Sequence, residues 1–580
     1  MTLRLLRTFG LYLALTVLLL VLPKFISLNT LTILILANIW AVFAMSWDIL
    51  AYTGQISFGH SFFIGLGGYT SALLALYVKM SPWLAMPLGG LVAALGGLLL
   101  AAPALRLHGP YFALITLLAA LVLDKVVRLL RIESAGAEGT LLGIPPLSLD
   151  WTEYYYYSVG LLLLVAGLLW TITRSQLGEI FTAIRDDEEA AKAAGFHTAK
   201  YKMLAFALSS FTAGLGGAFL AHYMMAISPA LLLNLDLSVE AIIAAVLGGM
   251  NTITGPIAGG YFLVLVREYL RPLGVWRFFA LTALTIAVLF LLPRGFWTEL
   301  RLRLFGVFQK LGLFPVSLQL STAGARASVA HKSNAPSLEH KLLELEQLRK
   351  AFGGLVAVNG LSFAVHEREI LGVIGPNGAG KTTVFNLIMG VYRPDSGHIL
   401  FKDREITGWP THKVVRAGIA RTFQIPRPFH LKTVLQNVAM PALPDTLWPR
   451  GTNSLSYAVS CCARAGLSGS DLFKLPAMLP QAGLRRLEIA RALATDPQLL
   501  LLDEPFAGLS AKEVEELSEL IRQLRDEGRT IVLVDHNMRG VMKLVDRVVV
   551  MHFGQKLAEG APQEVSQSKA VQEAYLAGGD

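Results

Sequence analysis

The sequence is short of cysteine and of charged side chains, and each shortage excludes a class of protein. Only two of the 580 residues are cysteines, the neighbours Cys461 and Cys462, which excludes a disulfide framework and a cysteine-based metal site. Charged residues make up 16% of the chain, where about 25% is ordinary for a globular domain. Together with 54% hydrophobic residues and a mean hydropathy of +0.54, this excludes a disordered chain and an ordinary soluble protein.

The charge is also unevenly distributed, because its density about doubles after residue 315. We therefore expect an α-helical membrane domain over residues 1–315, a flexible linker of small and polar residues over 316–341, and a soluble domain over 342–580. The half that holds the cysteines is expected in a reducing compartment. The net charge of +9 does not indicate a nucleic-acid partner, because the basic residues of the first part lie in short loops beside apolar runs, where they set membrane orientation.

Long uncharged runs recur in the first part of the chain. A helix needs about 20 apolar residues to cross about 30 Å of hydrocarbon, and a charge near the bilayer centre costs about 2.5–3.5 kcal/mol. We predict about ten membrane-spanning helices in a lipid bilayer. The expected spans lie near residues 9–23, 30–49, 61–78, 83–103, 110–130, 155–173, 203–225, 237–250, 255–270 and 277–293. The first run resembles a signal peptide but lacks a small-residue cleavage site, so we interpret it as a retained helix.

Basic side chains in the loops predict the orientation of these helices. The N-terminus, the loop 174–202 and the segment after residue 293 are rich in Arg and Lys, which places all three in the cytoplasm. The chain is accordingly expected in the cytoplasmic (inner) membrane, with its second part in the cytoplasm. Arg267, Arg271 and Arg277 disagree, because they would lie outside. Either a helix there is re-entrant or the count is wrong by one or two.

Three segments of the first part carry residues that a simple membrane span does not need. Gln55, Ser57 and His60 indicate either an interior pathway or hydrogen bonds between helices. Leu247–Gly260 interrupts an apolar run with Gly and Pro, which fits a broken helix lining a cavity or a tight turn. The loop 174–202 fits one or two short helices outside the membrane, which serve as a solvated connector or as a docking element for an ATPase.

The strongest motif of the second part is ILGVIGPNGAGKTT, an apolar strand followed by the spacing of a phosphate-binding loop. In such a loop the backbone N–H groups approach the phosphates, Lys381 reaches the β- and γ-phosphates, and Thr382 binds Mg²⁺. ATP and Mg²⁺ are therefore the expected cofactors. The expected nucleotide-binding residues of the loop are Gly375, Pro376, Asn377, Gly378, Ala379, Gly380, Lys381, Thr382 and Thr383.

Two further strands end in side chains suited to nucleotide hydrolysis. QLLLLDEP delivers Asp503 and Glu504, and TIVLVDH ends in His536. In a doubly wound α/β sheet the carboxyl ends of the strands present such groups to a ligand. Asp503 is expected to join the Mg²⁺ shell, and Glu504 to polarise the water that attacks the γ-phosphate. His536 is expected to contact that phosphate.

With these motifs, residues 342–580 resemble the ATPase of an ABC transporter. The resemblance implies that Phe352 in KAFGG stacks on adenine, and that Gln424 in RTFQ senses Mg²⁺ at the catalytic site and touches the permease. RTFQIPRPFHLKTVLQNV and DEPFAGLSAKEVEEL resemble more specifically the ATPase of branched-chain amino-acid uptake systems. The first part is similar to the permease of the same systems, through GQISFGHSFFIGLGGYTSALL, LRLHGPYFALITL, IRDDEEAAKAAGFHTAKYKMLAF and VLGGMNTITGPIAGG. The resemblance thus implies a permease fused to its ATPase.

One stretch departs from the family pattern. Family members carry LSGGQ or a close variant before RRLEIARAL, whereas this chain has LPQAG from Leu479. Pro480 replaces a serine whose hydroxyl would bind the γ-phosphate, and Ala482 replaces a glycine. Because such ATPases pair head to tail, we expect an asymmetric pair in which the site built on Lys381 and Glu504 performs most of the hydrolysis.

The resemblance implies ATP-driven import of branched-chain or related amino acids, handed over by an extracytoplasmic solute-binding protein. A second permease subunit and a second ABC ATPase, or a second copy of this chain, would complete the assembly. Three alternatives stay open: an exporter, an importer of urea or short amides, and a membrane-tethered ATP-binding regulator with little turnover. The sequence does not identify the cargo.

Overall fold

The structure, a computed structural model, describes most of the chain as two compact units. The described residues are 21–105, 110–130, 138–301, 303, 340–443, 454–536 and 538–576. Unit 1 comprises Met1–Arg185 and Ala199–Gln319, and unit 2 comprises Asp186–Thr198 and Leu320–Asp580, each as far as it is described. A short segment between two helices of unit 1 therefore belongs with unit 2. The linker predicted over 316–341 lies almost entirely outside the described residues.

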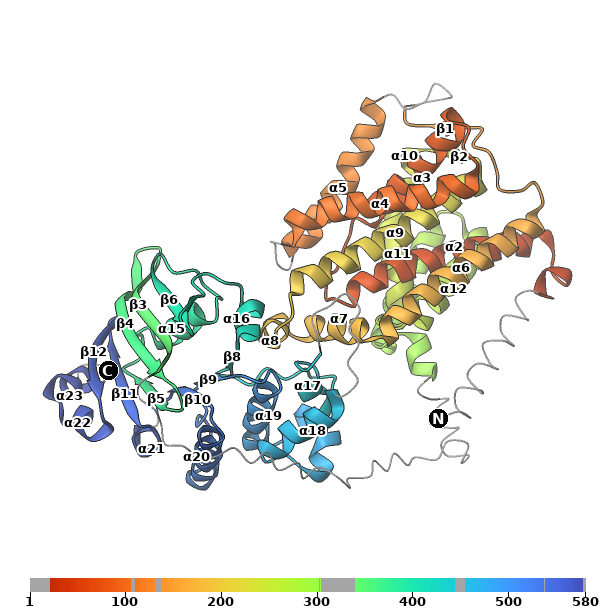
Figure 1. Cartoon of the computed structure of the whole chain (residues 1–580). Coiled ribbons are helices and arrows are strands. Elements are labelled where there is room, and N and C mark those ends of the chain that lie inside the picture. The colour runs from red at the N-terminus through yellow and green to blue at the C-terminus, as the bar shows by residue number, and fades with distance from the viewer. Residues whose placement is uncertain are drawn as a thin grey trace. The chain divides into compact units, whose positions relative to one another are not determined.

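Unit 1 consists of helices built from the apolar runs of the sequence (Figure 1). Helices satisfy every backbone hydrogen bond internally, which a lipid environment requires. The helices are η1 (Leu22–Lys24), α2 (Leu28–Ala51), α3 (His60–Tyr77), α4 (Pro82–Ala104), α5 (Pro110–Leu129), α6 (Trp151–Arg174), α7 (Gln176–Asp186), α9 (Thr198–Met224), α10 (Pro229–Leu232), α11 (Leu235–Gly248), α12 (Thr254–Tyr269), η2 (Arg271–Leu273) and α13 (Trp276–Leu291). The two-residue strands β1 (Leu141–Leu142) and β2 (Ala226–Ile227) pair antiparallel.

Five of these helices are long and apolar enough to cross a membrane. They are Leu28–Ala51, Pro82–Ala104, Trp151–Arg174, Thr198–Met224 and the broken helix Pro229–Gly248. The predicted count of about ten spans is therefore not confirmed. The span expected near 9–23 lies mostly outside the described residues. The other expected spans are present as α3, α5, α12 and α13, of 18, 20, 16 and 16 residues.

The helices α11 and α12 form a tight hairpin, and both are short. With 14 and 16 residues they are about 21 and 24 Å long, less than the about 30 Å of hydrocarbon. A Cβ on Gly248 would lie 1.8 Å from the carbonyl oxygen of Gly255, so only glycine permits this approach. Asp48 of α2 fixes the turn, because its Oδ1 accepts a hydrogen bond from the backbone N of Asn251 at 2.7 Å. The length of α12, which carries Arg267, fits the re-entrant alternative, whereas α11 together with α10 is long enough to cross.

The described residues of unit 2 contain two β-sheets. The larger has the strand order β12-β11-β5-β10-β9-β8, and all its neighbours are parallel except β11 and β12. The smaller is antiparallel, with the order β4-β3-β6-β7. The strands are β3 (Lys341–Phe352), β4 (Leu355–His366), β5 (Ile370–Ile374), β6 (Ser396–Phe401), β7 (Arg404–Glu405), β8 (Ile419–Arg421), β9 (Leu499–Asp503), β10 (Thr530–Val534), β11 (Arg547–His552) and β12 (Gln555–Gly560). The predicted α/β fold is thereby confirmed.

The central strands of the larger sheet are its core. Every residue of β5, β9 and β10 is buried, as expected for parallel strands covered on both faces, which read as continuous apolar runs. The helices of unit 2 are α8 (Glu188–Ala193), α15 (Lys381–Ile388), α16 (Thr411–Ala417), α17 (Val434–Ala439), α18 (Ser454–Arg464), η3 (Gly469–Phe473), η4 (Pro476–Met478), α19 (Gln481–Leu493), α20 (Ala511–Asp526), α21 (Met538–Leu544), α22 (Pro562–Gln567) and α23 (Lys569–Leu576).

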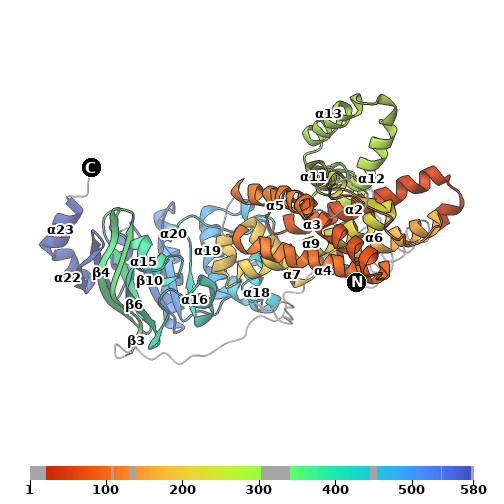
Figure 2. The same ribbon diagram turned by 90° about the horizontal axis from the view of Figure 1, so that it is seen from above.

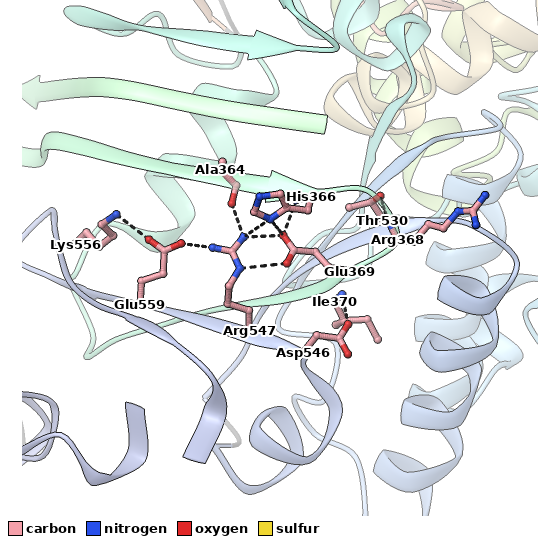
Figure 3. Close-up of polar contacts among 10 residues, drawn as sticks. All are labelled: Ala364, His366, Arg368, Glu369, Ile370, Thr530, Asp546, Arg547, Lys556 and Glu559. Atoms are coloured by element: carbon pink, nitrogen blue, oxygen red, sulfur yellow. Dashed lines mark hydrogen bonds and ion pairs between the residues drawn. The ribbon is translucent and has the colours of Figure 1, made fainter. Parts of the chain in front are cut away.

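A polar cluster joins the two sheets beside β5 (Figure 3). The guanidinium of Arg547, at the start of β11, donates to both carboxylate oxygens of Glu369, at 2.7 and 3.2 Å. It also donates to the carbonyl oxygen of Ala364 on β4 at 2.6 Å and bonds Glu559 on β12. Glu369 is 2% exposed and accepts a further bond from the backbone N of His366 at 2.6 Å. One arginine thus ties together strands of both sheets.

Candidate functional site

The loop between β5 and α15 has the geometry of a phosphate cradle. Gly380 ends the loop and caps α15 in the left-handed conformation, with φ of +94°. A Cβ on Gly380 would lie 2.2 Å from the carbonyl oxygen of Ala357, so glycine is required by both conformation and space. The N-terminus of α15, which begins at Lys381, is the positive end of the helix dipole and favours a bound anion.

Lys381 is folded back over this loop. Its Nζ donates to the carbonyl oxygens of Gly375 at 2.6 Å and Pro376 at 2.9 Å. Burial lowers the pKa of Lys381, and the nearby carboxylates of Glu504 and Asp503 oppose that shift. The ammonium is poorly solvated, and phosphate oxygens would be stronger partners for it than two carbonyls.

Asp503, the last residue of β9, is buried beside an arginine. Arg421 of β8 donates its Nη2 to Oδ2 of Asp503 at 2.7 Å. Burial raises the pKa of Asp503, and the Arg421 guanidinium opposes this shift. The other oxygen, Oδ1, is buried and has no hydrogen-bond partner within the described part of the chain.

This orphaned oxygen fits a magnesium ligand. Mg²⁺ is commonly held by one or two carboxylates together with substrate phosphates. Among the residues that the structure describes, no group of three or more His, Cys, Asp or Glu could hold a metal ion. Phosphate oxygens and the hydroxyl of Thr382 would therefore have to supply the other ligands beside Asp503.

Glu504 follows directly and is the point where the expected catalytic residues meet. Its backbone has φ of +46°, which is uncommon for a residue with a side chain, and its N donates to the carbonyl oxygen of Val534 at 2.7 Å. Its carboxylate accepts hydrogen bonds from Nε2 of Gln424 at 2.9 Å and from Nε2 of His536 at 2.7 Å. Three segments far apart in the sequence thus converge on one carboxylate.

A cavity of about 510 Å³ lies over these groups. The expected residues that line it are Phe352, Asn377, Gly378, Ala379, Gly380, Lys381, Thr382, Thr383, Gln424, Glu504 and His536. Gly375, Pro376 and Asp503 are not among the lining residues. The first two present carbonyls to Lys381, and Asp503 is fully buried.

Phe352 lies at the end of β3, with neighbours that sequence reasoning missed. Phe352 is 42% exposed, as a platform for a flat base requires, and its ring centroid lies 5.1 Å from that of Tyr392. Leu355, Val356 and Ala357, at the start of β4, also line the cavity. They extend the apolar surface beside Phe352. These three residues follow Phe352 after a short turn. Their nearness to Phe352 in the sequence is the signal that could have identified them.

The helix α19 holds the loop after β8, which carries Gln424. Glu488 of α19 is 3% exposed and accepts hydrogen bonds from the backbone N atoms of Phe423 at 3.2 Å and Arg427 at 3.1 Å. Arg491 donates to Glu488 at 2.7 Å. Sequence reasoning missed these residues, and a charged residue inside an amphipathic helix gives no signal of such a contact. The position of the loop is therefore set by α19.

Pro480 and Ala482 lie at the start of the same helix. Pro480 is the residue that precedes the first turn of α19, and its side chain makes no capping hydrogen bond. A serine at such a position usually accepts a bond from a backbone N–H of the first turn. This helix end therefore lacks the hydroxyl that the family pattern implies at this position.

The segment Asp186–Thr198 packs against α16 within unit 2. Nε of Arg416 donates to the carbonyl oxygen of Gly195 at 3.2 Å. Asp187 forms a 3.5 Å ion pair with Arg427, in the loop after β8. These contacts favour the docking element over the solvated connector.

In unit 1, Gln55, Ser57 and His60 are all buried. Nε2 of His60 lies 2.8 Å from Oγ of Ser46, and the carbonyl oxygen of Ser57 accepts a hydrogen bond from Nε1 of Trp47 at 2.8 Å. These bonds join α2 to the start of α3. His60 thus supports the alternative of hydrogen bonds between helices, whereas Oε1 of Gln55 and Nδ1 of His60 are buried without a hydrogen-bond partner among the described residues.

Family models match both units of the chain. Residues 29–292 match the model described as "Branched-chain amino acid transport system / permease component". Residues 358–507 match the model "ABC transporter", and residues 555–576 match "Branched-chain amino acid ATP-binding cassette transporter". The matches therefore extend over the helical unit and over the unit that holds the phosphate cradle.

Several curated relatives align with the second part alone. The high-affinity branched-chain amino acid transport ATP-binding protein LivG of Salmonella typhimurium is 40% identical over 253 residues, 41% of this chain and 99% of the relative. The corresponding protein BraF of Pseudomonas aeruginosa is 39% identical over 253 residues, with the same shares. The lipopolysaccharide export system ATP-binding protein LptB of Acidithiobacillus ferridurans is 36% identical over 245 residues, 41% of this chain and 97% of that protein.

Proposed function

Because this chain belongs to the branched-chain amino-acid ABC transporter family, we propose that it imports branched-chain amino acids as a permease fused to its ATPase. The observation that carries the proposal is the presence, in one chain, of a matching permease and of a cleft in which Lys381, Glu504 and His536 meet a phosphate cradle. The ABC ATPase unit indicates that ATP hydrolysis drives the transport. LptB shows that similar ATPases serve other cargo, so the cargo assignment rests on the permease match.

Nucleotide binding follows from the residues that line the cleft. The N–H groups at the start of α15 and the ammonium of Lys381 bind the phosphates, and the ring of Phe352 stacks on the base. Thr382 and Asp503 would hold Mg²⁺, which neutralises the phosphate charge when bound.

Hydrolysis needs a base and groups that hold it in place. Glu504 is the base that orients and polarises the attacking water, and Gln424 and His536 position its carboxylate through the two hydrogen bonds described above. Gln424 also lies in the loop that α19 holds. A change at the γ-phosphate would therefore be transmitted from Glu504 to that loop.

The segment Asp186–Thr198 would carry the motion to the membrane helices. It is continuous in the chain with α7 and α9, and its Asp187 pairs with Arg427. ATP binding shifts the equilibrium only through contacts that the closed pair makes and the open pair lacks. When the loop after β8 moves, the segment Asp186–Thr198 would move with it, and α7 and α9 would move with the segment.

The complete assembly requires more than this chain. A second permease and a second ATPase, or a second copy of the chain, would complete it, and an extracytoplasmic solute-binding protein would deliver the amino acid. The membrane is the cytoplasmic (inner) membrane, with the ATPase unit in the cytoplasm. Residues Pro480 and Ala482 support an asymmetric pair, because they weaken the site that this chain offers to its partner's nucleotide.

Uptake by reconstituted vesicles tests the function. Vesicles holding the assembly, its binding protein and internal ATP should accumulate leucine, and Lys381→Ala should abolish both uptake and stimulated ATP hydrolysis. Lys402→Ala, at an exposed turn outside the cleft, is the matched control and should leave both unchanged. Accumulation of urea in place of leucine, or no stimulation of hydrolysis by the binding protein, would contradict the proposal.

A further inference from the structure

An ion pair and a tryptophan meet among three helices of unit 1. Nη1 of Arg267 on α12 donates to both carboxylate oxygens of Glu240 on α11, at 3.2 and 3.3 Å. Nε1 of Trp40 on α2 donates to the same carboxylate at 2.6 Å. The guanidinium carbon of Arg267 lies 4.9 Å from the centroid of the Trp40 ring, in the range of a cation–π contact. The helices α2, α11 and α12 lie side by side in both views (Figures 1 and 2).

This group lies level with the middle of α2, a helix long enough to cross a membrane. Trp40 is the thirteenth residue of α2, which has 24 residues. With a rise of about 1.5 Å per residue, Trp40 is about 18 Å from either end of a helix long enough to cross the bilayer. The short hairpin of α11 and α12 brings Glu240 and Arg267 to the same depth.

Charged side chains at this depth need an explanation. They are costly there and usually face an interior path or a water-filled cavity. The pair is not sealed by its own helices, because the Glu240 and Arg267 side chains are 23% and 31% exposed. In transporters with broken or short helices, solute sites lie near this level.

We propose that Glu240, Arg267 and Trp40 form the place in the permease that receives the charged head of an α-amino acid during passage. The inference rests on the proposed function and adds to it a site and the chemistry that the site selects. A neutral α-amino acid carries one carboxylate and one ammonium. The Arg267 guanidinium matches the carboxylate, and the Glu240 carboxylate together with the Trp40 ring matches the ammonium.

The resting pair explains how such a site is tolerated without cargo. Glu240 and Arg267 neutralise each other, and Trp40 fixes the orientation of the carboxylate. An incoming amino acid replaces the single Glu240–Arg267 pair with two ion pairs. Its carboxylate pairs with Arg267 and its ammonium pairs with Glu240, so no charge is left without a partner. Urea and short amides carry no net charge on any group and would leave the original pair intact, so the site selects amino acids over them.

Two neutral variants test the site in the complete assembly with its binding protein. Glu240→Gln and Arg267→Met should each lower the leucine transported per ATP hydrolysed by about tenfold to a hundredfold, the loss expected for hydrogen bonds to a charged group. Stimulation of ATP hydrolysis by the binding protein should stay at the wild-type value. The double variant Glu240→Gln with Arg267→Met leaves neither charge unpaired, so it should keep the wild-type melting temperature while its uptake stays low. The matched control is Glu268→Gln, which removes the neighbouring carboxylate that pairs with Arg271 at 2.9 Å on the exposed side and should transport normally.

The exchanged pair Glu240→Arg with Arg267→Glu separates a binding role from a structural one. If the pair only holds α11 to α12, the exchange restores it and restores uptake, which overturns the proposal. If it binds cargo, the exchange places a guanidinium against the N–H of Trp40 and uptake stays low in a folded protein. Unchanged uptake in Glu240→Gln also overturns it, as does a melting temperature that falls in step with uptake in the double variant Glu240→Gln with Arg267→Met. Wild-type vesicles that take up no leucine would instead refute the proposed function, and the site with it.

Discussion

Glu488 allows the sharpest test of how unit 2 positions the loop after β8, which carries Gln424. Its carboxylate accepts hydrogen bonds from the backbone N atoms of Phe423 and Arg427 and from the guanidinium of Arg491. Glu488→Gln keeps the size of the side chain but replaces one oxygen with an NH₂ group, which then faces a donor. We expect the loop after β8 to open more often, while the fold of the sheet persists.

The magnitude follows from the burial of the pair. The side chains of Arg491 and Glu488 are 6% and 2% exposed, and removal of one partner from a buried pair costs about 3 kcal/mol. At about 1.4 kcal/mol per factor of ten, this corresponds to an about 100-fold larger equilibrium constant for local opening. Hydrogen exchange measured by mass spectrometry on the whole chain, in the peptide that covers residues 421–429, should therefore be about 100-fold faster.

A surface pair on the same helix provides the control. Arg486 donates to Glu516 of α20 at 2.9 Å, with side chains 24% and 48% exposed, and such pairs contribute at most about 1 kcal/mol. Glu516→Gln should therefore leave exchange of the loop unchanged. The reasoning is refuted if Glu488→Gln exchanges like the wild type, or if both variants accelerate exchange equally.

Three further predictions concern the same unit. Arg547→Met leaves the buried Glu369 carboxylate without its partner and should lower the free energy of unfolding of unit 2 by about 3 kcal/mol, measured by urea titration; a loss below about 1 kcal/mol would mean that the cluster is a surface pair. Gly380→Ala places a Cβ 2.2 Å from the Ala357 carbonyl oxygen and requires a left-handed φ, so ATP affinity should fall at least about tenfold in a nucleotide-binding titration; unchanged affinity would show that the loop adapts. Glu504→Gln should remove most ATP hydrolysis of the assembly, and the equivalent change in the partner ATPase should remove little; equal losses would refute the asymmetric pair.

The positions of the phosphate cradle and of the residues proposed for hydrolysis could be predicted from the sequence because their signals are local. The carboxyl ends of parallel strands lie at one edge of the sheet. Polar residues that follow buried strands are therefore expected at that edge, and Asp503, Glu504 and His536 lie there. The hydrogen bonds of Glu504 to Gln424 and His536 confirm that these side chains converge.

The contacts of Glu488 could not be predicted in this way. They join side-chain oxygens to backbone N atoms 61 and 65 residues away, and neither residue type at either end is diagnostic. Backbone N–H groups are present in every residue but proline, so only the tertiary structure shows which of them a buried carboxylate meets.

The number of membrane-spanning helices could not be predicted reliably from the sequence either. Hydropathy and the Gly and Pro residues of Leu247–Gly260 predict two segments here, and the structure has them as α11 and α12, joined by a turn. Hydropathy does not show whether a helix of 14 or 16 residues crosses the bilayer or turns back within it. Glu240 and Arg267 gave no signal as a pair, because 27 residues separate them.

The left-handed backbone of Glu504 implies a trade between durability and activity at this position. A side chain held at φ of +46° costs about 1–2 kcal/mol, which glycine would not incur. Replacement of Glu504 by glycine should therefore raise the melting temperature but abolish ATP hydrolysis. A laboratory screen that rewards heat resistance alone would enrich such variants, and only a screen for growth on the transported nutrient would retain the working enzyme.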